Sequence, residues 1–314
     1  MKKIVCLLLA VFTAGLSACA APQSAPPKSV MLILQSWSSS FAEDVIRGAN
    51  EAAKQNGLAL TVKTVSSIDA AKQQADLIQT AIEQGYSAIV IDPAGAGTVG
   101  PAVLEAVKKR VPVVSVNSGI EAGQSCSVDT DKNQMALGVF STVRRLEGKN
   151  ASVLLLNCLD EYINTQSLAE VLQMKIGDFP DMDLRQIDFH IGENEKLTND
   201  YTGCLATVTG DFTVIALNGY ATVFACNRIK ALSNGRKISV ISFSQDKNTI
   251  SMLEQNRIDA ICVNRNANIG YTAVEQANLC LKGDAPQNVL IPSVFADMQN
   301  LYSSEMQQIL FPLN

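Results

Sequence analysis

The sequence of 314 residues has few of the side chains from which catalytic and metal centres are built. It contains one histidine, His190, and one tryptophan, and aromatic residues make up only 5% of the chain. Its eight cysteines include no Cys-x-x-Cys pair, and the single histidine has no serine or cysteine partner at a recognisable spacing. We therefore expect His190 to be structural, and the protein to have no enzymatic activity, no metal and no cofactor.

Basic residues are also in the minority, with 25 lysines and arginines against 30 acidic residues and a formal net charge of −5. Nucleic-acid binding needs a basic excess to neutralise phosphates, so DNA and RNA are not expected as partners. Hydrophobic residues make up 47% of the chain against 18% charged, which is typical of a folded protein. The length exceeds the roughly 250–300 residues at which one core stops growing, which favours two lobes.

Residues 1–18 have the pattern of a secretory signal peptide, with two lysines before an apolar run that is too short for a membrane span. The Leu-Ser-Ala-Cys motif that ends at Cys19 resembles the bacterial lipobox, which implies that Cys19 is acylated. The small, proline-rich residues 19–28 suit a tether. No later segment has 18 uninterrupted apolar residues. We expect an extracytoplasmic protein, lipid-anchored to the cell membrane, at the cell surface or in the periplasm.

Six cysteines remain in the predicted mature chain, and most lie in apolar runs, where a free cysteine behaves as a small hydrophobic residue. This favours buried thiols over disulfides, although six cysteines would also permit 15 pairings. They are Cys126, Cys158, Cys204, Cys226, Cys262 and Cys280.

Short apolar runs alternate with segments of helical spacing along the chain, which predicts parallel sheets covered by helices on both faces. Ten strands are too many for one ordinary sheet, so we predict an α/β fold of two doubly wound, Rossmann-like lobes. The predicted strands are 30–34, 58–62, 87–91, 111–116, 151–156, 185–189, 212–216, 238–243, 259–263 and 288–291. The predicted helices are 41–56, 70–84, 99–109, 131–146, 164–176, 196–207, 221–232, 249–255 and 269–281.

Seven short motifs occur in the order and at the separations of the type I periplasmic binding proteins, in particular the ribose and galactose branch. They include Ile-Asp-Pro-Ala at 91–94, Val-Pro-Val-Val-Ser-Val-Asn at 111–117 and Ala-Leu-Asn-Gly at 216–219. The chain resembles this family from residue 30 to about 297. The resemblance implies a three-strand hinge that crosses near 129–131, 264–266 and 292–294. Lobe one would then comprise 29–130 and 265–291, and lobe two 131–264 and 292–314.

The resemblance implies a ligand in the cleft between the lobes, and doubly wound sheets bind ligands beyond the carboxyl ends of their strands. The side chains expected there are mostly amides, hydroxyls and aromatic rings, which suit a hydroxylated or amide-bearing solute. The predicted ligand-binding residues are Trp37, Ser39, Phe41, Asp92, Asn117, Asn157, Asn218, Ser244 and Asn264.

Several charged groups of the family are replaced in this sequence. The family's ligand-binding arginine falls at Leu168, one aspartate falls at Asn117, and another falls at Ser244, with Asp246 close by as a substitute. Asp160 and Glu161 are two further carboxylates that either reach the cleft or form part of a solvated loop. Loss of charge-assisted bonds to hydroxyls indicates weaker sugar binding or a different neutral solute.

The resemblance implies a monomeric solute-binding protein of an ABC importer, with a neutral sugar or polyol as the first candidate ligand. A nucleoside, an autoinducer-like molecule or another neutral metabolite is the second, and a role outside small-molecule transport is the third. A receptor that signals to a membrane histidine kinase is the rival for the partner. The related transcriptional repressors need a DNA-binding head, whose place the signal segment occupies.

Overall fold

The computed structural model describes residues 27–35, 39–65, 69–120, 123–160, 164–208, 210–229 and 235–311. The predicted signal peptide, Cys19, Trp37 and Glu161 lie outside these segments. Within them, no helix is both long and apolar enough to cross a membrane.

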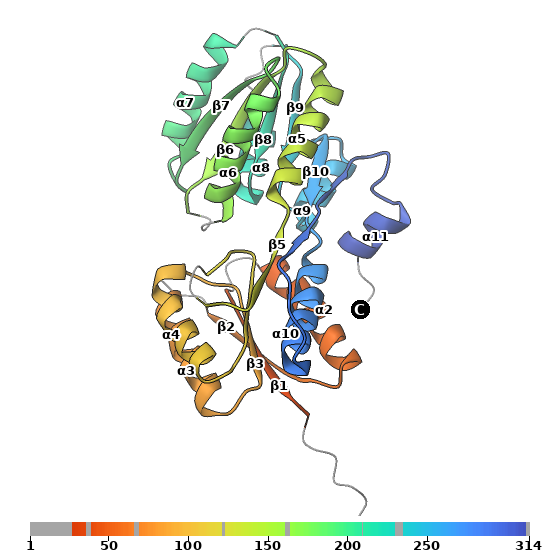
Figure 1. The fold of residues 1–314 in the computed structure, drawn as a ribbon. Helices are drawn as coiled ribbons and strands as arrows, with labels where there is room; N and C mark the ends of the chain where they lie inside the picture. The colour runs from red at the N-terminus through yellow and green to blue at the C-terminus, as the bar shows by residue number, and fades with distance from the viewer. Residues whose placement is uncertain are drawn as a thin grey trace, which may run out of the picture.

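The described strands form two six-stranded sheets, which confirms the predicted fold class of two α/β lobes (Figure 1). The first has the order β11-β5-β4-β3-β1-β2 and the second β12-β10-β9-β8-β6-β7. Neighbouring strands are parallel, except that β12 runs antiparallel to β10. The strands of the first sheet are β1 Ser29–Gln35, β2 Ala59–Val65, β3 Ala88–Ile91, β4 Val113–Val116, β5 Cys126–Thr130 and β11 Val289–Ile291. Those of the second are β6 Ser152–Cys158, β7 Asp183–Phe189, β8 Phe212–Ala216, β9 Ile238–Ser242, β10 Ala260–Val263 and β12 Val294–Ala296.

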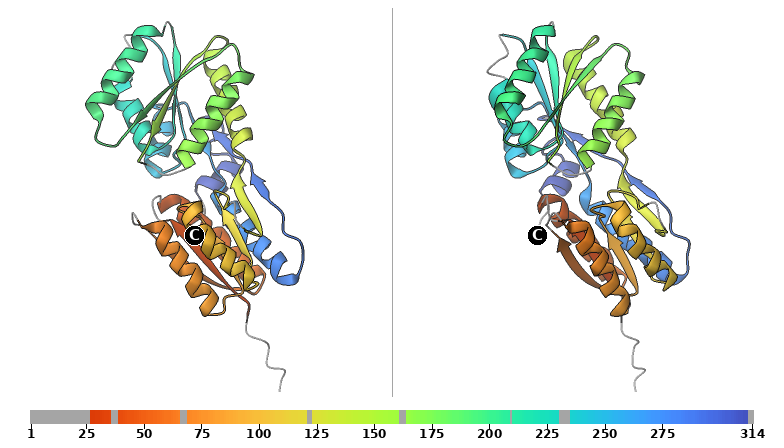
Figure 2. Two further views of the ribbon diagram at one scale, coloured as in Figure 1. Left: turned by 60° about the vertical axis from the view of Figure 1, so that its left-hand side comes forward. Right: turned by 90° about the vertical axis from the view of Figure 1, so that its left-hand side faces the viewer.

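Helices cover both faces of each sheet (Figures 1 and 2). Alternate residues of β1 point to opposite faces: Val30 and Leu32 pack with α2 and α10, whereas Met31 and Ile33 pack with α3 and α4. This two-sided burial explains the uninterrupted apolar run in the sequence. The helices are α2 Ser39–Gln55, α3 Ala70–Glu83, α4 Ala96–Lys108, α5 Lys132–Glu147, α6 Asn164–Lys175, α7 Asn194–Thr207, α8 Gly219–Phe224, α9 Lys247–Glu254, α10 Asn266–Lys282 and α11 Ser304–Leu310.

Three elements were not predicted from the sequence. β5 alternates buried and half-buried positions in Cys-Ser-Val-Asp-Thr, and β12 has only three residues, so neither shows a long apolar run. The short helix α11 is the third element that was not predicted. The helix predicted over 221–232 is instead the short α8, which continues as a π-helical turn over Ala225–Ile229. The six cysteines of the described structure are free thiols, of which four are buried and two, Cys204 and Cys280, are partly exposed.

Helices α2 and α10 pack backbone against backbone because glycines stand at their crossing. A Cβ added to Gly48 would lie 1.8 Å from the carbonyl oxygen of Ala267, and one added to Gly270 would lie 2.0 Å from that of Val45. These distances leave no room for a methyl group. The close crossing holds the middle of α2 against the start of α10.

We predict that Gly48→Ala and Gly270→Ala each lower the free energy of unfolding by about 1–3 kcal/mol or more, because the helices must separate. Gly203→Ala is the matched control: Gly203 lies within α7 with no atom within 4 Å of an added Cβ, so alanine there should be neutral or stabilising by up to about 1 kcal/mol. Urea unfolding measures all three variants. Equal effects at the three positions would contradict the proposed crossing.

Candidate functional site

The topology places the carboxyl ends of both sheets toward one another. The chain passes between the sheets after β5, after β10 and after β11, each time from the carboxyl end of a parallel strand. Since the other parallel strands run in the same direction, their carboxyl ends lie on the side of the crossings as well. The loops that follow these strands therefore border the space between the lobes, where such sheets bind ligands.

In the first lobe, Asp92 and Asn117 lie together at the ends of β3 and β4. The Asn117 Nδ2 atom donates to the Asp92 Oδ1 atom at 3.4 Å, and Asn117 has a left-handed backbone with φ of 67°, which asparagine tolerates better than most residues. Asp92 is 3% exposed. Its burial raises the pKa of the carboxyl to about 7, against the lowering effect of hydrogen bonds from Asn117 and Gln35.

Two glutamines support the segment that begins with Asp92, and one of them, Gln74, was not predicted as part of the site. Gln74 Nε2 donates to the Asp92 carbonyl oxygen at 2.7 Å, and Gln74 Oε1 accepts from the Ala94 N–H at 2.7 Å. Gln35 Nε2 donates to the Pro93 carbonyl oxygen at 3.2 Å. Gln74 is fully buried among the apolar residues of its helix face. A glutamine on an apolar helical stripe is the signal that could have identified it.

The raised pKa of Asp92 predicts that its contribution to stability falls as pH rises. Between about pH 4 and pH 7 the folded protein keeps a proton that the unfolded chain has released, so stability decreases over this window. The uncharged Asp92→Asn variant loses this decrease of stability with pH. Its melting temperature relative to the wild type should therefore be higher at pH 8 than at pH 5. Asp284→Asn, which removes an exposed carboxylate, is the control, and parallel pH profiles for wild type and Asp92→Asn would refute the assignment.

In the second lobe, Asn218 and Ser244 lie at the ends of β8 and β9. Asn218 is 4% exposed and caps α8, since its Oδ1 accepts from the Ala221 N–H at 2.8 Å. Its Nδ2 has no hydrogen-bond partner among the described residues. The Ser244 hydroxyl donates to the Asp246 Oδ2 atom at 2.5 Å, and a Cβ on Gly219 would lie 3.1 Å from that oxygen. The Asp246 carboxylate therefore borders the turn that contains Asn218.

Asn157 and Leu168 are uncharged, whereas a site that binds sugar hydroxyls by charge-assisted hydrogen bonds needs charged side chains. Asn157 is fully buried, and its Nδ2 donates to the Asp188 Oδ1 atom at 2.7 Å. Leu168 is buried in an apolar cluster with Leu217 and Phe243. Leu168 therefore belongs to the core of the lobe, and an arginine at this position would have to turn its charge away from the cluster.

Of the remaining predicted residues, Asn264 lies at a crossing between the lobes, and Ser39 and Phe41 lie in the first turn of α2. The Asn264 N–H donates to Gln245 Oε1 at 2.8 Å, and Asn264 Oδ1 accepts from the Ser293 hydroxyl at 2.8 Å, so this amide joins two of the three crossings. Phe41 is half-buried against the α2 and α10 core. Ser39 begins α2, but its side chain lies outside the described part of the structure. The structure thus brings Asp92 together with Asn117 and Asn218 together with Ser244, whereas the hydrogen bonds that it gives do not join the two pairs.

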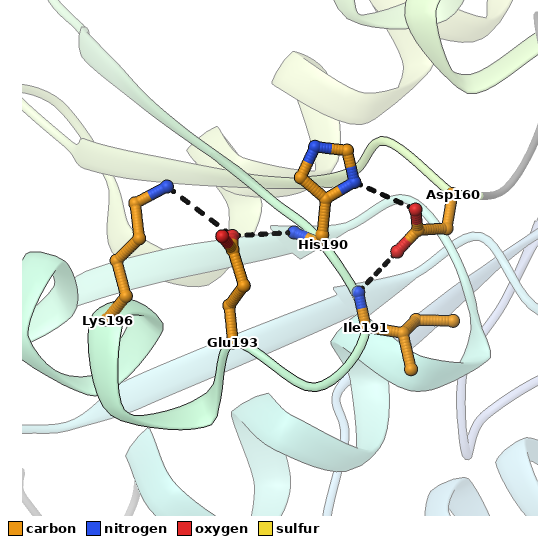
Figure 3. Close-up of polar contacts among 5 residues, drawn as sticks. All are labelled: Asp160, His190, Ile191, Glu193 and Lys196. Atoms are coloured by element: carbon orange, nitrogen blue, oxygen red, sulfur yellow. Dashed lines mark hydrogen bonds and ion pairs between the residues drawn. The ribbon is translucent and has the colours of Figure 1, made fainter.

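Asp160 pairs with His190 at the edge of the second sheet (Figure 3). The Asp160 Oδ1 atom lies 2.8 Å from the His190 Nδ1 atom, and Oδ2 accepts from the Ile191 N–H. The backbone N–H of His190 donates to Glu193 Oε2 at 3.1 Å, and Lys196 Nζ lies 3.4 Å from the same oxygen. The hydrogen bond with Asp160 raises the pKa of His190, and the same bond lowers the pKa of Asp160. This pair connects the loops after β6 and β7, which supports the structural role expected for His190.

We predict that Asp160→Asn lowers the pKa of His190, because the imidazolium loses its carboxylate partner. The raised pKa means that the pair stabilises the fold below about pH 6.5, the ordinary histidine value, and that this contribution is lost as pH rises through the folded-state pKa. In an NMR titration the imidazole signals are assigned to His190 unambiguously, because the protein has one histidine. Glu193→Gln is a weaker perturbation, since Glu193 bonds the backbone of His190. An unchanged titration in Asp160→Asn would show that the pair does not form.

The chain belongs to the periplasmic binding protein family, since residues 30–285 match the periplasmic binding protein domain. These are solute-binding proteins rather than enzymes. The chain is 23% identical over 302 residues to the ribose import binding protein RbsB of Bacillus subtilis strain 168, covering 92% of this chain and 97% of RbsB.

Solved structures share the fold over almost its full length. A carbohydrate transporter solute-binding protein from Agrobacterium radiobacter in complex with D-arabinose has a TM-score of 0.73 and 20% identity, covering 91% of this chain and 100% of that one. The XylFII–LytSN complex contains a chain with a TM-score of 0.69 and 16% identity, covering 87% of this chain and 100% of that one. At such identities these structures support the two-lobed fold alone.

Proposed function

We propose that this protein is a lipid-anchored, extracytoplasmic solute receptor that closes on a neutral sugar or polyol and presents it to an ABC permease. The observation that carries the proposal is the set of amide and hydroxyl groups at facing strand ends of two lobes. Asn117 from one lobe and Asn218 and Ser244 from the other supply donors and acceptors without an arginine or lysine. Such a set suits hydroxyl groups, each of which both donates and accepts.

Closure requires the lobes to move about the three crossings. We assign residues 29–130 and 265–291 to lobe one and residues 131–264 and 292–314 to lobe two. Only short segments join the two sheets, and hinge closure around a ligand is a common response of such a design. The unpartnered Nδ2 atom of Asn218 is a buried polar group whose lack of a hydrogen bond costs about 1–3 kcal/mol. Rearrangement around a ligand hydroxyl would remove this cost.

The relatives support the same class of solute. RbsB is named for ribose import, and the Agrobacterium structure contains D-arabinose. The XylFII–LytSN complex favours a second candidate function, in which the closed lobes act on a signalling partner, such as a membrane histidine kinase, instead of a permease. Both functions require the same closure, and they differ only in the partner protein that recognises the closed lobes.

We predict that a ligand-induced rise in melting temperature is lost in Asn218→Ser. Serine keeps a side-chain oxygen to cap α8 but removes the amide donor, so the unliganded protein should stay folded. The measurement is a thermal-shift panel of pentoses, hexoses, polyols and nucleosides on the mature chain. Asn199→Ser, at an exposed position of α7, controls for loss of an amide. If a sugar stabilises Asn218→Ser as much as wild type, Asn218 is not part of the site. If no sugar or polyol stabilises the wild type, the solute class is wrong.

A further inference from the structure

A groove with a volume of about 320 Å³ lies where helices α2, α10 and α11 meet. We call it the junction groove. Among the residues that the structure describes, none of those predicted to bind ligand in the cleft lines this groove. Figures 1 and 2 both place α11 beside the starts of α2 and α10. The volume of the junction groove is at the lower end of the roughly 300–1,000 Å³ typical of small-molecule sites. The residues that line it include Asp44, Arg47, Arg265, Asn266, Glu305 and Gln308.

The junction groove is built from both lobes. Helices α2 and α10 pack on the first sheet, whereas α11 packs on the core of the second sheet through Met306. An ion pair between Arg265 and Glu305 joins the start of α10 to α11. A molecule bound here therefore touches both lobes at a place outside the cleft.

The charges that line the junction groove sum to zero. Arg47 pairs with Asp44, with 2.8 Å between Nη1 and Oδ1, and Arg265 pairs with Glu305. Burial raises the pKa of Asp44, an effect that hydrogen bonds from Arg47 and Asn266 oppose. A ligand with net charge of either sign would unbalance these pairs. A net-neutral ligand with separated charges would complement both signs.

Two buried polar atoms at the start of α10 lack hydrogen-bond partners among the described residues. They are the Nε atom of Arg265, a donor, and the Oδ1 atom of Asn266, an acceptor. Asn266 is only 5% exposed, so the unmet bond is expensive. Arg265 occupies the N-cap position of α10 without a side-chain cap, and the N-terminus of a helix favours a negative group. Both atoms are closed off from solvent in this conformation, so a ligand satisfies them only if the two side chains turn toward the groove that they line.

We propose that the junction groove binds a small zwitterion, a molecule of α-amino-acid size that carries one carboxylate and one ammonium group. The carboxylate binds beside the guanidinium groups of Arg47 and Arg265, and the ammonium group binds beside the carboxylates of Asp44 and Glu305. The side chains of Arg265 and Asn266 turn toward the ligand as it binds, which gives the Nε and Oδ1 atoms their missing hydrogen bonds. Because both lobes line the groove, binding there changes with the angle between the lobes. By thermodynamic reciprocity, a ligand in the cleft and a ligand in the groove then alter one another's affinity.

Isothermal titration calorimetry on the mature, unliganded protein tests this site independently of any sugar. L-Serine is the probe, and acetate, ethylamine and glycerol each carry only part of its chemistry. We expect serine to bind, and each of the other three to bind at least tenfold more weakly. Equal binding of acetate would show an anion site, equal binding of ethylamine would show a cation site, and equal binding of glycerol would show a polyol site. Each result would overturn the zwitterion.

Two variants then locate the site. Glu305→Gln and Arg265→Gln should each weaken serine binding at least tenfold, whereas Arg228→Gln, an exposed arginine remote from the groove lining, should leave it unchanged. Glu305 is half-exposed on a surface helix, so its variant keeps the test valid even if Arg265→Gln disturbs the hinge. Absence of serine binding to the wild type, or unchanged binding in both variants, would overturn the proposal.

Discussion

The structure depends on one constraint, which is that every crossing between the lobes leaves from the carboxyl end of a parallel strand. β5, β10 and β11 each end at a crossing, and the remaining parallel strands must then end on the same side. The loops that carry Asp92 and Asn117 therefore face the loops that carry Asn218 and Ser244. A site between two separate sheets needs no long loop to reach across, because topology alone brings the two edges to the same space.

Electrostatics within these edges distinguish the two lobes. In lobe one the carboxyl of Asp92 is buried without a cation. Its burial raises its pKa to about 7, so the group is partly protonated near neutral pH. In lobe two the carboxylate of Asp246 instead accepts from the Ser244 hydroxyl and from the Thr249 N–H at 2.8 Å, at the start of α9. Neither carboxylate forms an ion pair among the described residues. These oxygens could accept from ligand hydroxyl groups, which supports the hydroxylated solute proposed above.

The sequence predicted the strands that are buried on both faces, because their apolar runs are uninterrupted, as in Val30 to Leu34. It could not predict β5, in which polar residues interrupt the apolar ones, or β12, which is apolar but has only three residues. The ends of strands identified Asp92, Asn117 and Asn218 as candidate site residues. The partner that orients the Asp92 backbone, Gln74, comes from a helix face 18 residues earlier in the chain. Such contacts depend on the way in which segments distant in sequence pack, which no local pattern contains.

The replacement of the family's arginine by Leu168 shows how specificity and stability are linked in this cleft. Leu168 packs with Leu217 and Phe243, and Leu217 directly precedes the Asn218 that caps α8. The apolar cluster thus holds the backbone from which the amide projects. An arginine would add two or more charge-assisted bonds to a ligand, but it would have to leave this cluster and expose the apolar side chains around it. The protein therefore has a firmly positioned neutral amide next to the position where the family has a charged contact, which supports the neutral solute proposed for this cleft.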